Sequence, residues 1–170
     1  MKLLVDEITS PMGTMLLVSD GAAVVTLDFA DCRQRLEGSL ARRFGPFELR
    51  PAADPGGFSS AVRRYFAGDL GAVAELPVRL AGTPFQETVW AALRSIPVGA
   101  TTTYGELAAG LGRPGAARAV GRANALNPVG IAVPCHRVIG ADGSLTGYAG
   151  GIERKRWLLE HEGVVVAGLG

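Results

Sequence analysis

The decapeptide IAVPCHRVIG at residues 131–140 decides how the rest of this sequence is interpreted. Its apolar run ends at Pro134, and Cys135 and His136 then stand side by side, followed by Arg137. A cysteine is a nucleophile only as the thiolate, and a neighbouring His or Arg favours that form. The pair alone fits either a catalytic thiol or a buried structural cysteine beside a chance histidine. The rest of the sequence is needed to decide between these two interpretations.

Length and composition set the outer limits. The chain has 170 residues, enough for one domain or two small ones, and its 48% hydrophobic and 19% charged residues are ordinary for a soluble globular protein. Its apolar runs are shorter than the roughly 18 residues of a membrane span, and the N-terminus turns acidic too early for a signal peptide. With only Cys32 and Cys135, a disulfide framework and a Cys-rich zinc site are excluded. A free nucleophilic thiol persists in a reducing compartment, so we expect a cytoplasmic protein without a membrane partner.

Charge is unevenly distributed although the formal net charge is only +1. No acidic residue occurs between Glu106 and Asp142. Four arginines fall in this interval: Arg113, Arg118, Arg122 and Arg137. Such a basic stripe fits a phosphate-binding face, and it equally fits a solvated helix face.

The first half of the chain reads as a small α/β scaffold. Short runs rich in Leu, Val, Ile and Thr predict three strands of an antiparallel meander, at residues 3–9, 14–19 and 23–29. Four-residue apolar spacing predicts helices at 32–44 and 58–66. Proline and glycine predict a loop at 45–57, and a short strand is expected around 78–80. This half has no histidine, and Cys32 has no base near it in sequence, so no chemistry is expected here.

The second half is mainly helical in its pattern. Capping boxes at Thr83–Gln86 and Thr103–Glu106 open two helices, which run to about residues 96 and 111. A third helix at 116–125 follows the second after a tight turn. Two short helices joined by such a short connection, here the second and the third, are the helix-turn-helix pattern. An apolar strand at 131–133 is expected to deliver Cys135. A turn at 141–144 and a last helix at 152–162 complete the prediction.

Several segments of this half resemble one family, in that family's order. They are Gly82–Gln86, Val89–Trp90, Thr103–Ala108, Ala116–Gly121, Asn127–Pro128, Pro134–Ile139 and Trp157–Gly163. Together they resemble the O6-alkylguanine-DNA alkyltransferases, strongly over residues 82–163 and only in outline before them. The resemblance implies an α+β protein of two domains. An RNase H-like α/β domain would cover residues 1–81, and a mainly helical domain of the winged or helix-turn-helix type would cover residues 82–170.

The resemblance also implies a function. Members repair DNA by suicide: a cysteine takes the alkyl group from O6-alkylguanine, or less efficiently from O4-alkylthymine, and is not regenerated. The expected partner is double-stranded DNA, bound from the minor groove with the damaged nucleotide flipped out. The expected protein is a monomer that uses no cofactor. Some relatives bind a structural zinc through additional cysteines and histidines, but this chain has two of each, so we expect no metal.

The family's catalytic residues map onto four positions. Cys135 would be the nucleophile, and His136 would take its proton through a water. Glu162 would hold the imidazole in the required tautomer and stabilise the imidazolium. Asn127 would complete the hydrogen-bond network of Cys135, His136 and Glu162. It would also brace the turn that follows the recognition helix.

Further residues would contact the DNA or the flipped base. The Tyr104 hydroxyl would approach N3 of guanine, and Arg118 would fill the gap left by the extruded nucleotide. The carbonyls of Cys135 and Val138 would face the guanine amino group, and the backbone N–H of Ala149, where some relatives have Ser, would face O6. The remaining expected contacts are Ala117, Arg122, Tyr148, Gly150 and Lys155.

Three other functions compete with this one. A DNA-binding regulator would explain the helix-turn-helix and the basic stripe, but it gives no role to Cys135 and His136. An alkyltransferase-like lesion sensor would bind alkylguanine without repairing it, but such relatives replace the reactive cysteine, typically by Trp. A cysteine hydrolase would turn over, whereas suicide repair predicts one event per molecule.

Overall fold

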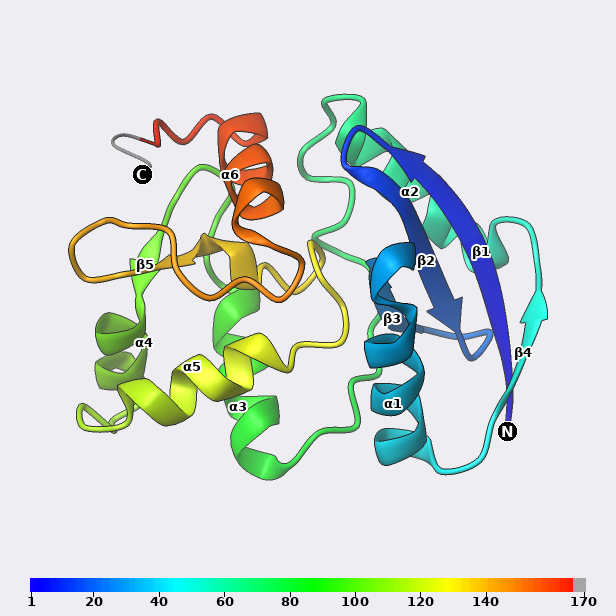
Figure 1. The fold of residues 1–170 in the computed structure, drawn as a ribbon, viewed down its shortest axis with the longest axis horizontal. Coiled ribbons are helices and arrows are strands. Elements are labelled where there is room, and N and C mark those ends of the chain that lie inside the picture. The colour runs from blue at the N-terminus through cyan, green and yellow to red at the C-terminus, as the bar shows by residue number, and fades with distance from the viewer. Residues whose placement is uncertain (167–170) are drawn as a thin grey trace. The chain divides into compact units, whose positions relative to one another are not determined.

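The computed structural model describes residues 1–166, so the last four residues of the apolar tail lie outside the described part of the chain. Two compact units are present (Figure 1). The N-terminal unit comprises Met1–Gly82 together with Pro128–Ala132, and the C-terminal unit comprises Thr83–Asn127 and the chain from Val133 onward. The return of a short segment, Pro128–Ala132, to the N-terminal unit has no counterpart in the sequence patterns.

A four-stranded sheet forms the N-terminal unit, in the order β3-β2-β1-β4. Its first three strands confirm the predicted antiparallel meander: β1 (Lys2–Ser10), β2 (Gly13–Ser19) and β3 (Val24–Phe29). The two predicted helices are also present, as α1 (Arg33–Phe44) and α2 (Phe58–Phe66). Leu36 and Leu40 of α1 are buried against Leu3, Leu16 and Val18 of the sheet, so the predicted apolar spacing does build a core.

The loop predicted at residues 45–57 is wrong in part, because it contains strand β4 (Glu48–Pro51). This strand pairs in parallel with β1, from Lys2 opposite Glu48 to Val5 opposite Pro51. The terminal proline suits an edge strand, where its missing N–H costs no ladder bond. The strand predicted around residues 78–80 shrinks to one parallel bridge between Val78 and Val24.

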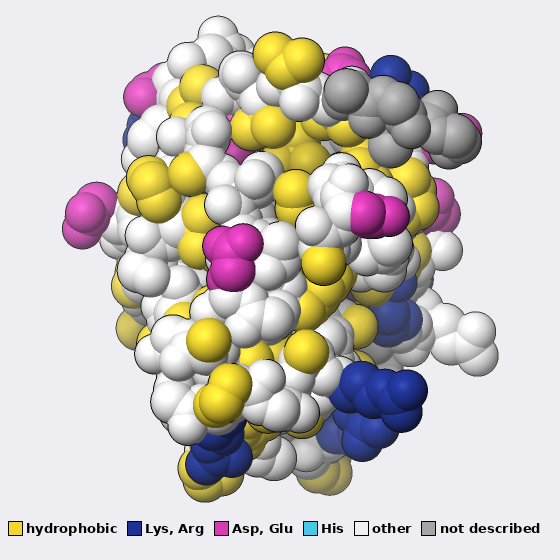
Figure 2. All heavy atoms as spheres, turned by 90° about the vertical axis from the view of Figure 1, so that its left-hand side faces the viewer, with side chains coloured by type: hydrophobic (Ala, Val, Ile, Leu, Met, Phe, Trp, Pro, Cys, Tyr) yellow, Lys and Arg dark blue, Asp and Glu magenta, His cyan; other side chains and the backbone are white. Residues whose placement is uncertain are grey.

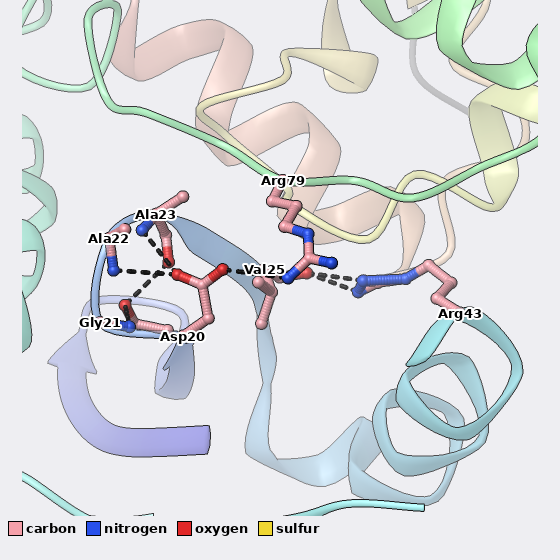
Figure 3. A network of polar contacts seen from close by, with 8 residues as sticks. Asp20, Gly21, Ala22, Ala23, Val25, Arg43 and Arg79 are labelled. Atoms are coloured by element: carbon pink, nitrogen blue, oxygen red, sulfur yellow. Dashed lines mark hydrogen bonds and ion pairs between the residues drawn. The ribbon is translucent and has the colours of Figure 1, made fainter. Parts of the chain in front are cut away.

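A polar network holds the turn between β2 and β3 (Figure 3). Oδ1 of Asp20 accepts the backbone N–H groups of Ala22 and Ala23 at 2.9 Å each, and Oδ2 lies 3.4 Å from Nη1 of Arg79. Arg43 of α1 donates to the carbonyl of Val25 at 2.8 Å. These bonds hold the turn and the first residues of β3 in place without adding a strand.

The expected strand at residues 131–133 is also wrong. Residues 128–130 attach to β3 instead: Leu27 N donates to the carbonyl of Pro128, and Gly130 N donates to the carbonyl of Leu27, both at 3.0 Å. Ile131 then adopts a left-handed backbone with φ 71°, which breaks any extended run. The apolar residues are buried by packing rather than by strand pairing.

The C-terminal unit is built mainly from helices. Helices α3 (Pro84–Arg94), α4 (Tyr104–Gly110), α5 (Ala117–Ala125) and α6 (Ile152–His161) confirm the four predicted ones. Two short strands, β5 (Thr102–Thr103) and β6 (Val138–Ile139), pair in parallel between them. Within residues 1–166, no helix has the length and apolar character that crossing a membrane requires.

Side-chain caps fix where these helices begin. The capping box at Thr83 is complete. The Thr83 hydroxyl oxygen accepts from Gln86 N, and the Gln86 side-chain oxygen accepts from Thr83 N. The box at Thr103 is half formed: its hydroxyl accepts Glu106 N, while the Glu106 carboxylate accepts from Thr102 instead. The buried Trp90 ties α3 to α5 by donating from Nε1 to the carbonyl of Ala123 at 2.8 Å.

Candidate active site around Cys135

A single turn of 3-10 helix, η3 (Cys135–Arg137), carries the cysteine. Arg137 N donates to the carbonyl of Pro134, and Val138 N closes the turn on the carbonyl of Cys135. With three residues per turn, consecutive side chains of such a helix point about 120° apart. Cys135, His136 and Arg137 therefore face three different surroundings although they are adjacent in sequence. All three are buried.

Glu162 is the hub of the polar contacts below this turn. It follows α6 directly, and its side chain has no exposed area. One carboxylate oxygen, Oε2, lies 2.9 Å from Nε2 of His136. The fork of Arg137 binds both oxygens, with Nε donating to Oε1 at 2.8 Å and Nη2 donating to Oε2 at 3.0 Å. The predicted pairing of His136 with Glu162 is thus present in the geometry, and it has a second cationic partner.

Arg137 does not belong to the basic stripe that the sequence suggests. Its side chain is only 7% exposed, and its remaining nitrogen Nη1 donates to the carbonyl of Ile96 at 2.6 Å. Counting charges along the sequence could not reveal this, because the partner lies 25 residues away in a different helix. The fork instead anchors η3 to α6 and to the end of α3.

The electrostatic surroundings keep His136 neutral. Complete burial lowers the pKa of His136, and the charges of Arg137 and Lys155 act in the same direction, while Glu162 opposes them. A neutral imidazole that faces a carboxylate through Nε2 carries its hydrogen there, because only an N–H donates to that acceptor. The other ring nitrogen, Nδ1, is then a bare base. It is buried and has no hydrogen-bond partner among the protein atoms of residues 1–166.

Two asparagines brace the backbone that leads to Cys135. Nδ2 of Asn127 donates to the carbonyl of Val133 at 2.7 Å, in agreement with its predicted bracing of this turn. Asn124 was not identified from the sequence, although its Nδ2 lies 3.4 Å from the carbonyl of Cys135. The available signal was a polar residue four positions after Val120, on the helix face that turns out to be buried.

Lys155 is fully buried within the same site. Its ammonium group donates to the carbonyls of Val138 and Thr146, at 2.6 and 2.7 Å. Burial lowers the pKa of Lys155 to about 8, and only the neighbouring charge of Cys135 acts to raise it. Because the Val138 carbonyl accepts from Lys155, and the Cys135 carbonyl accepts from Asn124 and Val138 N, both expected substrate-facing carbonyls already have protein donors.

Tyr104 stands at the start of α4, facing Cys135 across the site. Its hydroxyl donates to the carbonyl of Thr146 at 3.2 Å, and burial raises the pKa of this phenol, an effect to which Cys135 adds. Two glycines adjoin this side chain: a Cβ on Gly121 would lie 3.6 Å from the ring, and one on Gly147 would lie 3.5 Å from the hydroxyl, both at ordinary van der Waals distance. Gly147 has φ +58°, a backbone conformation that favours glycine.

The other predicted contact residues lie outside this buried cluster. Tyr148 is half-buried and Ala149 is exposed, in the loop before α6. On α5, Arg118 and Arg122 are exposed and Ala117 is half-buried. Figure 2 shows the face on the α4 and α5 side, where Lys and Arg side chains gather toward the lower edge and acidic side chains lie higher. Gly150 contributes its carbonyl, which accepts from Arg154 at 3.3 Å.

No group of three or more His, Cys, Asp or Glu side chains in residues 1–166 is arranged to hold a metal ion. The groups gathered at the site are a thiol beside a neutral imidazole, and the charged side chains of Glu162, Arg137 and Lys155. A thiol that loses its proton to such a base is a nucleophile.

Comparison with known proteins places this geometry in a family. Residues 84–164 match the family described as "6-O-methylguanine DNA methyltransferase, DNA binding domain". The methylated-DNA--protein-cysteine methyltransferase of Salmonella typhimurium is 48% identical over 169 residues, which is 98% of this chain and 99% of that protein. The Mycobacterium bovis protein of the same name is 48% identical over 91% of this chain and 89% of its own length.

Solved structures agree with the sequence matches. The crystal structure of the Mycobacterium tuberculosis O6-methylguanine methyltransferase has a TM-score of 0.76 and 40% identity, covering 98% of this chain and 96% of that one. A second crystal structure, of the Mycobacterium tuberculosis protein OGT in complex with DNA, has a TM-score of 0.78 and 43% identity, covering 95% and 92%. The resemblance inferred from the motifs is confirmed, and this chain belongs to the methylated-DNA--protein-cysteine methyltransferase family.

Proposed function

We propose that this protein is a single-turnover DNA repair protein that transfers the alkyl group of O6-alkylguanine in DNA irreversibly to Cys135. O4-alkylthymine is the less efficient second substrate. The observation that carries the proposal is the buried Cys135 beside a neutral His136 that is held by Glu162, in a chain 48% identical to named methyltransferases over nearly its whole length.

The transfer is a displacement at carbon. His136 takes the proton of the Cys135 thiol through a water, and the thiolate electron pair forms a bond to the alkyl carbon. The bond between that carbon and O6 breaks, and its electron pair stays on the guanine. The product is a thioether, which has no acidic S–H and no good leaving group. The cysteine is therefore not regenerated, and each molecule acts once.

Neighbouring groups lower the barrier by matching the charge that moves. When the base is bound, the Tyr104 hydroxyl donates to N3 of the leaving guanine in place of the Thr146 carbonyl, which offsets the negative charge that develops on the base. The Lys155 ammonium favours the thiolate, since opposite charges stabilise each other in a poorly solvated site. Tyr148, Ala149 and Gly150 wall the base pocket, with the N–H of Ala149 directed at O6. The Val138 carbonyl faces the guanine amino group beside its one protein donor, Lys155, and the Cys135 carbonyl faces it beside its two, Asn124 and Val138 N.

Helices α4 and α5 form the DNA-binding helix-turn-helix of this proposal. Arg118 fills the space of a nucleotide flipped out toward the minor groove, and Ala117 and Arg122 flank it on the same helix. The exposure of Arg118 and Arg122 on α5 and the DNA complex of the similar Mycobacterium tuberculosis protein support this assignment. The N-terminal unit is the RNase H-like scaffold of a monomeric protein. A nucleophilic thiol such as that of Cys135, which forms no disulfide, favours a reducing compartment such as the cytoplasm.

The decisive experiment is incubation with duplex DNA that contains O6-methylguanine, followed by intact-mass measurement and peptide mapping. One added methyl group per molecule, located on Cys135, is the expected result. Cys135→Ser abolishes the adduct, while the matched Cys32→Ser variant retains it. Repeated turnover would point to a hydrolase, and tight DNA binding without an adduct would point to a lesion sensor or a regulator; either result refutes the proposal.

A further inference from the structure

Asn124 is a buried polar residue to which the reaction described above gives no role. It lies in the last turn of α5, and only 2% of it is exposed. Its neighbours on the buried face of this helix, Val120 and Ala123, are small or apolar. A buried carboxamide is costly unless its donors and acceptors are paired, so its contacts show what it does.

The contact with Cys135 fixes which way the amide points. Nδ2 of Asn124 lies 3.4 Å from the carbonyl oxygen of Cys135. A carbonyl only accepts hydrogen bonds, so the NH₂ end must face it and the oxygen end must face away. This carbonyl belongs to the peptide unit that joins Cys135 to His136. The amide of Asn124 therefore lies against the backbone between the nucleophile and its base.

Three buried side-chain atoms have no hydrogen-bond partner among the protein atoms of residues 1–166, and two of them belong to this site. These two are Oδ1 of Asn124 and Nδ1 of His136; the third is a serine hydroxyl elsewhere. Both are acceptors while the imidazole is neutral. Once Nδ1 takes a proton it becomes a donor, and Oδ1 then offers what the new N–H needs. The two orphaned atoms are thus complementary in the protonated state only.

We propose that Asn124 is a positioning residue for alkyl transfer, which holds the Cys135 carbonyl through Nδ2 and accepts through Oδ1 the hydrogen that His136 acquires at Nδ1. Because the two atoms do not hydrogen-bond to each other in the structure, the bond forms through one bridging water. The proton that moves is the one lost by the Cys135 thiol, whose electron pair goes to the alkyl carbon. This inference rests on the proposed function, because it assigns a part in that same transfer.

Three charged side chains act on His136: Lys155 of α6, Glu162 just after α6, and Arg137 of η3. Tyr104 of α4 faces Cys135 rather than the imidazole. Of these groups only Glu162 favours the imidazolium, and its charge is shared with Arg137. A neutral acceptor at Nδ1 therefore makes a substantial difference to whether His136 can hold a proton.

The test replaces Asn124 by Leu, which keeps the volume and removes both polar ends. The single-turnover rate with free O6-benzylguanine is measured from pH 6 to 10. The variant should be slower near pH 7 by roughly 10- to 100-fold, the usual worth of a hydrogen bond to a charged group. Above about pH 9 the loss should shrink, since a cysteine there ionises without a base. A rate within twofold of the unaltered protein at pH 7 overturns the proposal.

Val120→Ala is the matched control, because it truncates a fully buried side chain one helical turn earlier on α5. A purely structural effect should slow transfer equally at all pH values in both variants. If the Asn124→Leu loss is independent of pH like that of the control, Asn124 does not serve the proton transfer.

A second measurement needs no variant of Asn124 and so does not depend on its folding. The chain has only two histidines, so His161→Gln leaves one imidazole whose ¹⁵N resonances belong to His136. The neutral ring should carry its hydrogen on Nε2, and a neutral Nδ1–H tautomer overturns the inference. Failure of the proposed function is distinct, since Cys135 would then receive no alkyl group in any variant.

Discussion

Replacing Arg137 by Met tests the charge arrangement below the active-site turn most directly. The methionine keeps much of the volume but leaves the Glu162 carboxylate, which is fully buried, without its bidentate partner. Removing one member of a buried ion pair costs about 3–5 kcal/mol of unfolding free energy, because the other charge remains desolvated. We expect a loss of that size at about pH 8. The bond from Arg137 to the carbonyl of Ile96 disappears as well.

The loss should depend on pH, with a sign that the geometry fixes. In the unaltered protein the pKa of His136 lies below its ordinary value of 6.5, so its contribution is present above that pH and is lost on acidification. Burial remains the main cause that lowers the pKa of His136 in the variant, but without Arg137 one of the lowering charges is gone, so this pKa moves back toward its ordinary value. The variant therefore loses less stability through His136 on acidification than the unaltered protein does. The penalty of Arg137→Met should accordingly be smaller at pH 6 than at pH 8.

Urea denaturation followed by tryptophan fluorescence measures this effect. Both tryptophans, Trp90 and Trp157, belong to the C-terminal unit, so the signal reports on the unit that holds the site. Arg156→Met is the matched control. It removes an arginine from an Arg–Glu pair on α6 whose side chains are 47% and 50% exposed, and such pairs contribute less than about 1 kcal/mol. Equal penalties in both variants, or a penalty for Arg137→Met that does not change with pH, would refute the reasoning.

Two further predictions concern the reaction and the DNA. Lys155 is charged beside Cys135 below its pKa of about 8, so Lys155→Met should slow transfer at pH 7 by roughly tenfold. Above about pH 9 the two rates should converge in a single-turnover assay, and a constant ratio would contradict this. Arg118→Ala should slow repair of duplex DNA by roughly tenfold or more, because base stacking is lost, but should spare the reaction with free O6-benzylguanine. Equal losses on both substrates would exclude the finger role.

Much of the fold was predictable because local signals and packing agree there. The capping residues Thr83 and Thr103 begin helices as expected, and the meander strands end at the predicted turns. Strand β4 was not predicted because it lies among prolines and glycines and because its partner, β1, lies more than 40 residues earlier in the chain. Pairing over such distances depends on register and leaves little trace in four residues of sequence.

The candidate site was predictable through its motifs rather than through its contacts. Cys135 and His136 are adjacent in sequence, but their link to Glu162 spans 26 residues and follows only from the resemblance. Arg137 was assigned to a surface stripe because its charge was counted without its partner. Asn124 was missed because its one signal, a polar residue four positions after Val120, has no meaning until the burial of that helix face is known.

The failed strand prediction has a physical lesson about how Cys135 is presented. Ile131 is a β-branched residue with φ 71°, a conformation that costs on the order of 1–3 kcal/mol and persists only when its surroundings dictate it. Its surroundings do: Pro128 and Gly130 are bonded to Leu27 on one side, and Asn127 binds the Val133 carbonyl on the other. Had extended backbone continued from residues 131–133 through residue 137, it would have pointed Cys135 and Arg137 to one side and His136 to the other. The 3-10 turn instead gives each of the three its own direction, so Arg137 and His136 can both reach Glu162 while the thiol faces elsewhere.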